Sequence, residues 1–174
     1  FDVGQGHCFF FKSNKHNVAI LIDAGSKKAP VDSIPSYEHG RADAVNPKRK
    51  RIIIEKIKAC GIDDNTKFIC IVTHGDQDHY SWIYDILRGI TAGKKLNNFL
   101  CILGGKSTDY QPRNGPELTT SMLRRLGAQS RFVADSQLDV AALNQIIAQT
   151  IGQHGDFEMQ ILNASAPNST GSPD

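Results

Sequence analysis

One short polar segment constrains this chain more than any other: residues 73–79, which read Thr-His-Gly-Asp-Gln-Asp-His. An apolar run at 68–72 precedes the segment, and a pattern with helical spacing follows it. A buried strand that continues through a short loop into a helix holds that loop in one place. The loop carries four side chains of the kinds that bind metals: His74, Asp76, Asp78 and His79. A divalent metal held there would activate water near neutral pH and polarise a phosphoryl or carbonyl oxygen.

A simpler interpretation of the same segment is a polar turn whose acidic residues cap the next helix. Asp78 suits the N-cap position of such a helix. Capping accounts for one carboxylate, but it does not account for two histidines and two aspartates at this spacing after a buried strand. We therefore favour a metal site over a helix cap.

Composition places the chain among globular proteins. It has 174 residues, enough for one domain with a core, of which 40% are hydrophobic and 22% charged. The net charge of +2 does not by itself indicate a polyanionic partner, and the basic cluster 48–51 is interpreted as a solvated first turn of a helix. The four cysteines show no Cys-x-x-Cys spacing and are expected to be buried free thiols.

Localisation is constrained only weakly. No apolar run is long enough to span a membrane, and no signal peptide is visible. The chain begins at Phe1 without a methionine, so a leader could have been lost. The expectation is a cytoplasmic or unassigned location.

Hydrophobic patterns predict an alternation of strands and helices. Apolar runs at 8–11 and 18–22, separated by polar residues, predict a hairpin, and residues 27–46 predict a long loop. Further strands are predicted at 68–72, 98–103, 131–133 and 157–162. Helices are predicted at 47–60, about 80–90, 117–126 and 140–151. The first helix would bury Ile53, Ile54, Ile57 and Cys60. The order predicts an α/β (α+β) fold in which helices cover a mixed sheet.

Two further segments share a family pattern with the loop at 73–79. Residues 1–6 read Phe-Asp-Val-Gly-Gln-Gly, and residues 21–25 read Leu-Ile-Asp-Ala-Gly. In this order the three segments resemble the metallo-β-lactamase superfamily, most of all the metallohydrolase domain of ComEC-type DNA-uptake competence proteins. The resemblance implies an αββα sandwich, with residues 1–174 as one hydrolase domain. The superfamily loop is His-x-His-x-Asp-His; here Asp76 replaces the second histidine, as in the competence-type branch.

The resemblance also implies a ligand set and a reaction. His74 and Asp76 would bind one divalent metal and Asp78 and His79 a second, with Asp23 bracing the loop from behind. Asp78 would be catalytic, orienting a metal-bound hydroxide. A carboxylate in place of one imidazole suits Mn²⁺ or Mg²⁺, and Zn²⁺ also fits. Two such metals suit phosphodiester hydrolysis, so the expected substrate is a nucleic acid.

The chain departs from the family pattern in two places. The family adds a bridging aspartate and later histidines, whereas the only histidine after His79 is His154, in a turn-like segment that we do not expect to bind metal. We therefore expect a sandwich that is incomplete at both ends. His7 stands where the family usually has aspartate, and it is either a site-lining residue or a surface histidine.

Two other functions remain open. One is a hydrolase of the same fold that acts on a thioester, lactone or β-lactam, although such branches usually keep the second histidine. The other is a non-catalytic binding module with a degenerate site. The sequence does not decide between DNA and RNA, nor does it indicate an oligomeric state.

Overall fold

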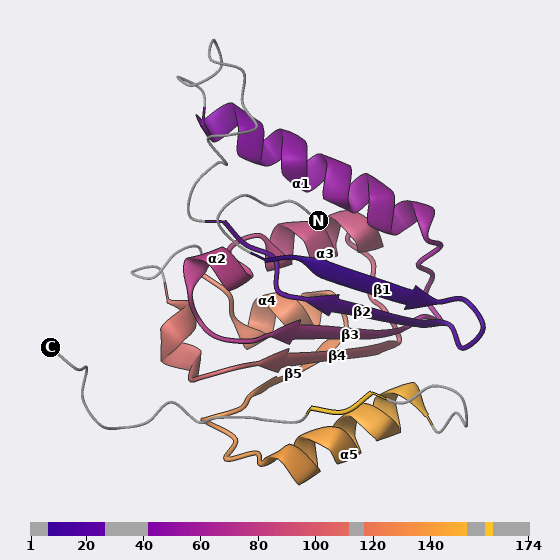
Figure 1. Ribbon diagram of the computed structural model, residues 1–174, viewed down its shortest axis with the longest axis vertical. Helices are drawn as coiled ribbons and strands as arrows, with labels where there is room; N and C mark the ends of the chain where they lie inside the picture. The colour runs from indigo at the N-terminus through magenta and orange to yellow at the C-terminus, as the bar shows by residue number, and fades with distance from the viewer. Residues whose placement is uncertain (1–6, 27–41, 112–116, 153–158, 162–174) are drawn as a thin grey trace, which may run out of the picture.

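A single mixed sheet organises the described part of the chain. The computed structural model describes residues 7–26, 42–111, 117–152 and 159–161, with 42–47 as backbone alone. The sheet contains, in spatial order, β1 Phe9–Ser13, β2 Val18–Ile22, β3 Lys67–Val72, β4 Asn98–Leu103 and β5 Ala128–Phe132 (Figure 1). β1 pairs antiparallel with β2, and each later pairing is parallel. The carboxyl ends of β2 to β5 therefore share one edge.

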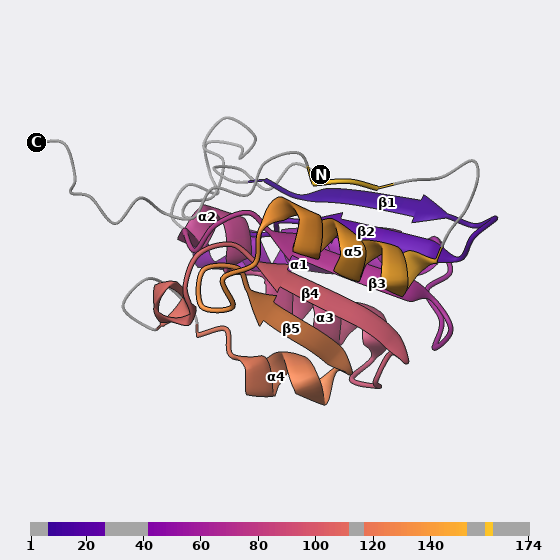
Figure 2. The ribbon, with the colours of Figure 1, turned by 90° about the horizontal axis from the view of Figure 1, so that it is seen from below.

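Helices cover both faces of this sheet. They are α1 Ala42–Ala59, α2 Gln77–Tyr80, α3 Ile83–Thr91, α4 Thr120–Arg125 and α5 Val140–Ile151, with a 3₁₀ turn, η3, at Ser107–Tyr110. α1, α3 and α4 pack on one face, and α5 packs on the other. Figure 2 shows α4 and α5 on opposite sides of β4 and β5.

Burial on both faces explains the nearly continuous apolar runs of the central strands. In β3, Phe68, Cys70 and Val72 face the helices α1, α3 and α4, whereas Ile69 faces α5. α3 contributes the buried stripe that its helical spacing predicts, namely Ile83, Ile86, Leu87 and Ile90. The expected fold class, a mixed sheet covered by helices, is confirmed, as are the hairpin and the bounds of β4 and α5.

Several predicted boundaries are wrong. α1 begins at Ala42 and runs through Pro47, because alanine and a first-turn acidic residue favour helix ahead of the proline. The single helix expected at 80–90 is two helices separated by a turn at 81–82. α4 begins at Thr120, after Thr119 caps it by accepting a bond from the Met122 backbone nitrogen.

Three further predictions need correction. β5 begins at Ala128 and not at residue 131. Cys60 is exposed, because it lies beyond the last turn of α1 and its thiol bonds the Lys56 carbonyl. The described part of the expected last strand, 159–161, is not a strand, because the Asn144 side chain bonds both the nitrogen and the carbonyl of Ile161.

The described helices include none that is both long and apolar enough to cross a membrane. Some expectations lie outside the described residues. These are the Gly-Gln-Gly segment at 1–6, most of the loop at 27–46, His154 and the tail from residue 165.

Candidate metal centre

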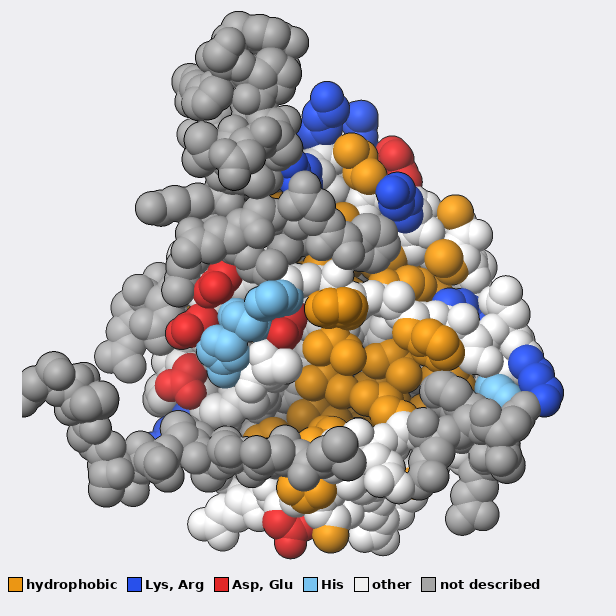
Figure 3. Space-filling model, in the orientation of Figure 1, with side chains coloured by type: hydrophobic (Ala, Val, Ile, Leu, Met, Phe, Trp, Pro, Cys, Tyr) orange, Lys and Arg blue, Asp and Glu red, His pale blue; other side chains and the backbone are white. Residues whose placement is uncertain are grey.

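The residues predicted to form the site gather at the carboxyl edge of the sheet. Asp23 directly follows β2, and the loop 73–79 directly follows β3. Because β2 and β3 are parallel neighbours, both segments emerge side by side. Ligand sites in open α/β sheets occupy this edge. Figure 3 shows histidine side chains gathered there with acidic side chains around them, beside an exposed hydrophobic patch of the sheet.

Asp23 is the buried anchor of this arrangement. Its Oδ1 accepts a hydrogen bond from the Thr73 backbone nitrogen at 2.8 Å, and its Oδ2 accepts one from Thr73 Oγ1 at 2.9 Å. His79 Nδ1 lies 2.8 Å from the same Oδ2. The side chain is only 5% exposed, so these three contacts supply the polar surroundings that a buried carboxylate needs. Asp23 therefore ties the end of β2 to the loop after β3.

These contacts orient two imidazole rings through their Nδ1 atoms. An ionised carboxylate only accepts hydrogen bonds, so the Thr73 hydroxyl proton and the His79 Nδ1 proton both point at Asp23. With its one proton engaged, Thr73 Oγ1 can only accept from His74 Nδ1, which lies 3.1 Å away. When a cation lies between each Nε2 atom and its carboxylate, this pattern leaves the hydrogen of both rings on Nδ1. The Nε2 lone pairs then face the cation, the usual arrangement for metal-binding histidines.

The Nε2 atoms are paired with carboxylates as the resemblance implies. His74 Nε2 lies 3.3 Å from Asp76 Oδ2, and His79 Nε2 lies 3.9 Å from Asp78 Oδ2. Two ligands that hold one cation at about 2.1 Å lie about 3.0–3.4 Å apart. The first pair thus has the spacing of a shared cation, and the second needs a shift of about half an ångström to reach it.

The candidate ligands are arranged as two His–Asp pairs, each a candidate position for one cation. The rings of His74 and His79 are 3.7 Å apart between centroids, so both pairs belong to one cluster. Among the residues that the structure describes, no group of three or more His, Cys, Asp or Glu side chains is arranged around a single point. The described residues therefore offer two ligands for each cation, and further ligands would be water, substrate or other residues.

His7 lies beside this cluster. Its ring centroid is 5.2 Å from that of His79, and its backbone nitrogen donates to the Asp78 carbonyl at 3.4 Å. Its side chain is exposed, so the ring faces the same solvent as the candidate ligands. His7 is therefore a surface histidine that lies beside the candidate ligands.

The helix-capping interpretation agrees with the structure in position but not in hydrogen bonding. Asp76 occupies the N-cap position of α2, and its side chain makes no capping bond. Asp78 lies inside the first turn of α2. Burial differs along the loop: the side chains of His79 and Asp78 are 13% and 21% exposed, whereas those of His74 and Asp76 are 49% and 62% exposed. The second pair is therefore held inside the molecule, and the first faces solvent.

Sequence reasoning assigned no role to Thr73 or to the packing of Gly25. A Cβ at Gly25 would lie 2.3 Å from the Gln77 carbonyl oxygen and 2.7 Å from the Asp78 carbonyl carbon. The backbone after β2 can approach the loop this closely only because residue 25 has no side chain. The sequence pointed to Thr73 and Gly25 only through their positions inside the motifs 73–79 and 21–25. Their contacts join distant segments and so leave no local pattern.

Comparisons of the chain with protein-family models, with curated proteins and with solved structures found no match. The resemblance to metallo-β-lactamase hydrolases therefore rests on residues 1–6, 21–25 and 73–79.

Proposed function

We propose that this chain is a metal-dependent hydrolase with the metallo-β-lactamase-like fold, and that its substrate is a nucleic acid phosphodiester. One observation carries the proposal: Thr73 and Asp23 contact the Nδ1 atoms of His74 and His79, and the Nε2 atom of each ring lies next to a carboxylate. A helix cap or a solvated turn needs no such arrangement. Metal ligation does need it, because a ring nitrogen binds a cation only through its lone pair.

The donors divide into two candidate positions for divalent cations. His74 and Asp76 would hold one, and Asp78 and His79 would hold the other. Carboxylate oxygens and imidazoles in equal number suit Mn²⁺ and Zn²⁺, and Mg²⁺ suits the carboxylates. When bound, such cations make water more acidic and offset the charge that develops on a phosphodiester.

The residues of the chain have separate tasks around these positions. Asp23 would hold the His79 ring in one orientation through its Nδ1 atom, and Thr73 would do the same for the His74 ring. The Asp78 carboxylate is one-fifth exposed, so it can accept a hydrogen bond from a water molecule at the solvent side of the cluster. A carboxylate there can orient that water and take its proton.

The choice of a phosphodiester rests on ligand chemistry and on access. Asp76 places a hard oxygen donor where an all-imidazole site would favour softer metals. His74 and Asp76 are about half exposed or more, so the first pair can be reached from the surface by a polymer. Small-molecule sites, in contrast, usually enclose most of their ligand.

The direct test is cleavage of labelled single- and double-stranded DNA and RNA with Mn²⁺, Mg²⁺ or Zn²⁺ added singly. Strand cleavage by the parent chain is expected, and its loss in the double variant His74→Ala, Asp78→Ala. A matched control is His16→Ala, Asp64→Ala, which removes one histidine and one aspartate at residues 14–17 and 64–65, the turns away from the cluster. The control should cleave like the parent.

Two outcomes would overturn the proposal. Equal cleavage by the His74→Ala, Asp78→Ala variant would show that the cluster is not the active centre. Turnover of a thioester, lactone or β-lactam without nucleic acid cleavage would keep the metal centre and change the substrate class.

A further inference from the structure

A polar cavity lies along the edge strand β5, apart from the candidate metal centre. Its volume is about 490 Å³, and its polar lining comes from Lys95, Thr120, Arg124, Gln129, Ser130 and Arg131. Lys95 precedes β4, and Ala128, which also lines the cavity, is the first residue of β5. The cavity therefore follows the edge strand from its amino end, whereas the metal centre lies at the carboxyl ends of β2 and β3.

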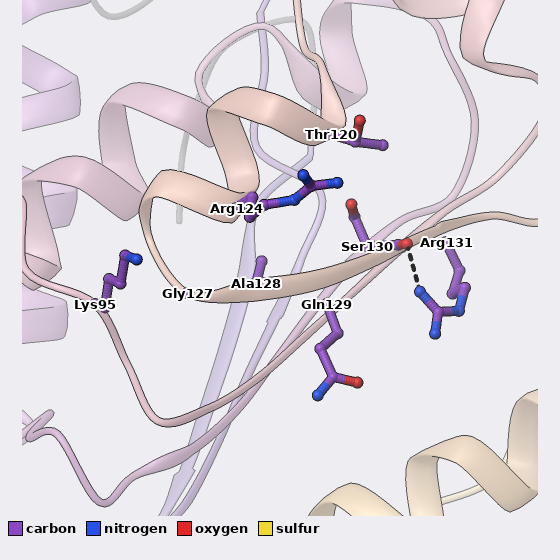
Figure 4. A pocket seen from close by; sticks show the side chains of 8 residues that line it. All are labelled: Lys95, Thr120, Arg124, Gly127, Ala128, Gln129, Ser130 and Arg131. Carbon is purple, nitrogen blue, oxygen red and sulfur yellow. Dashed lines mark hydrogen bonds between the residues drawn. The ribbon is translucent and has the colours of Figure 1, made fainter.

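The lining of this cavity is basic. Among the described residues that line it, three are cationic and none is an aspartate or glutamate. Lys95, Arg124 and Arg131 are all exposed, and within the described parts of the chain none of them forms an ion pair. Arg131 Nη1 donates to the Ser130 carbonyl at 3.0 Å, which engages one of its five N–H groups (Figure 4). The described walls of the cavity thus hold positive charge without a counter-charge of their own.

The cations lie on both sides of the edge strand. Ile102 and Arg131 are register partners, so Arg131 faces the α5 side, as does Gln129. Cys101 and Ser130 are partners on the other side, which α4 covers. Figure 4 shows the Arg124 guanidinium pointing toward Thr120 and Ser130, with Lys95 apart at one end and Arg131 extending away at the other. The charges are therefore spread along the strand and do not converge on one point.

We propose that this cavity along β5 binds the phosphodiester backbone of a nucleic acid, outside the candidate metal centre. Cations spread along a strand suit a linear polyanion such as a phosphodiester backbone, whereas a single compact anion would need them to converge. Ser130, Thr120 and Gln129 add uncharged hydrogen-bond donors between the cations, as phosphate contacts commonly do. The contacts carry no base recognition, so binding is expected to be independent of sequence.

Charged residues on an edge strand have another common role, which is to prevent pairing with a strand of a second molecule. That role needs charge at the edge but no cavity and no hydroxyl or amide donors between the charges. It also predicts no affinity for polyanions beyond that of any surface with the same charge. A binding measurement with a charge-matched control therefore separates the two interpretations.

The experiment measures anisotropy of a fluorescein-labelled single-stranded 12-mer titrated with the full chain, in EDTA. The chelator removes metal-dependent cleavage and metal-bridged binding, so the result does not depend on the proposed hydrolysis. The test variant is Lys95→Gln, Arg124→Gln, Arg131→Gln. The control is Arg51→Gln, Lys56→Gln, Lys58→Gln, which removes three exposed cations of α1 and gives the same net charge. Far-UV circular dichroism and thermal unfolding check that both variants fold.

The test variant should bind at least about tenfold more weakly than the parent near 0.1 M salt, and the control should bind nearly as well as the parent. The slope of log affinity against log salt should fall by about 2 in the test variant, because each cation that no longer neutralises a phosphate of a single strand lowers it by about 0.7. Equal losses of affinity in both triple variants would overturn the proposal in favour of net charge alone. Inorganic phosphate that binds the same residues as tightly as the 12-mer, at matched ionic strength, would overturn it in favour of a compact anion.

Discussion

Asp23 Oδ2 and His79 Nδ1 lie 2.8 Å apart and join the end of β2 to the first helical turn after β3, across 56 residues of sequence. The contact positions a ring whose other nitrogen faces Asp78. Asp23 adopts a left-handed backbone conformation, with φ 51°, which aspartate and asparagine tolerate better than most residues. The backbone after β2 thus turns sharply to bring this carboxylate under the loop.

Replacing Asp23 with asparagine should weaken metal binding while keeping the fold. Asparagine tolerates the same φ, but it removes the charge that holds the His79 Nδ1 proton. Loss of such a partner typically lowers metal affinity about 10–100-fold. Isothermal titration with Mn²⁺ or Zn²⁺ measures this change, and thermal unfolding measures stability. Asp64→Asn, at an exposed turn, is the control and should bind metal like the parent. Unchanged affinity in Asp23→Asn would contradict the bracing role.

Added metal should stabilise the folded chain. A ligand that binds only the folded state at 100 times its dissociation constant adds about 2.7 kcal/mol. For a chain of this size, that corresponds to a rise of about 5–10 °C in Tm. Differential scanning calorimetry with and without Mn²⁺ checks the rise, and EDTA should reverse it. The His74→Ala, Asp78→Ala variant should show no rise; an equal rise would place the binding elsewhere.

Gly25→Ala should disrupt the loop 73–79 more than an alanine substitution at a positive-φ glycine elsewhere in the chain. Its Cβ would lie 2.3 Å from the Gln77 carbonyl, and backbone must move to make room. Overpacking of this kind costs about 1–3 kcal/mol, and here it shifts the segment that carries Asp78. Urea unfolding and metal titration should both show a loss. Gly61→Ala is the control, because its φ of +74° is strained but nothing lies within 4 Å of the new Cβ. It should lose stability only.

The parts of the fold that sequence predicted well are those with strong local patterns. β4 and α5 have the predicted bounds, because an apolar run before Gly104 and a stripe of Leu143, Ile147 and Ile151 are local signals. The prediction that Asp76 and Asp78 bind metal also came from a local signal, their spacing within one loop. The start of α1 was missed, because Pro47 is a helix-start signal that the chain does not use.

The parts that sequence could not predict depend on contacts between distant segments. Thr73 is held by a hydrogen bond to Asp23, fifty residues earlier. Gly25 packs against the backbone of α2, which leaves no space for a side chain. The Asn144 side chain forms hydrogen bonds with the Ile161 backbone, where a neighbouring strand was expected to do so. The spacing of hydrophobic residues gives no sign of this contact. The basic cavity is a further case, because Lys95, Arg124 and Arg131 line one cavity only after β4 and β5 have paired.

The four cysteines should differ sharply in reactivity toward a thiol reagent at pH 8. Cys60 is exposed, whereas Cys8, Cys70 and Cys101 are buried. Burial raises the pKa of the Cys8 thiol to about 12. A hydrogen bond with the Cys101 thiol, together with burial, raises the pKa of the Cys70 thiol. The thiols of Cys8 and Cys70 therefore stay protonated and unreactive at pH 8. Titration with a chromogenic disulfide should show one fast equivalent in the folded chain and four in denaturant. Cys60→Ser should abolish the fast equivalent, and rapid reaction of two or more thiols in that variant would contradict the burial of the core cysteines.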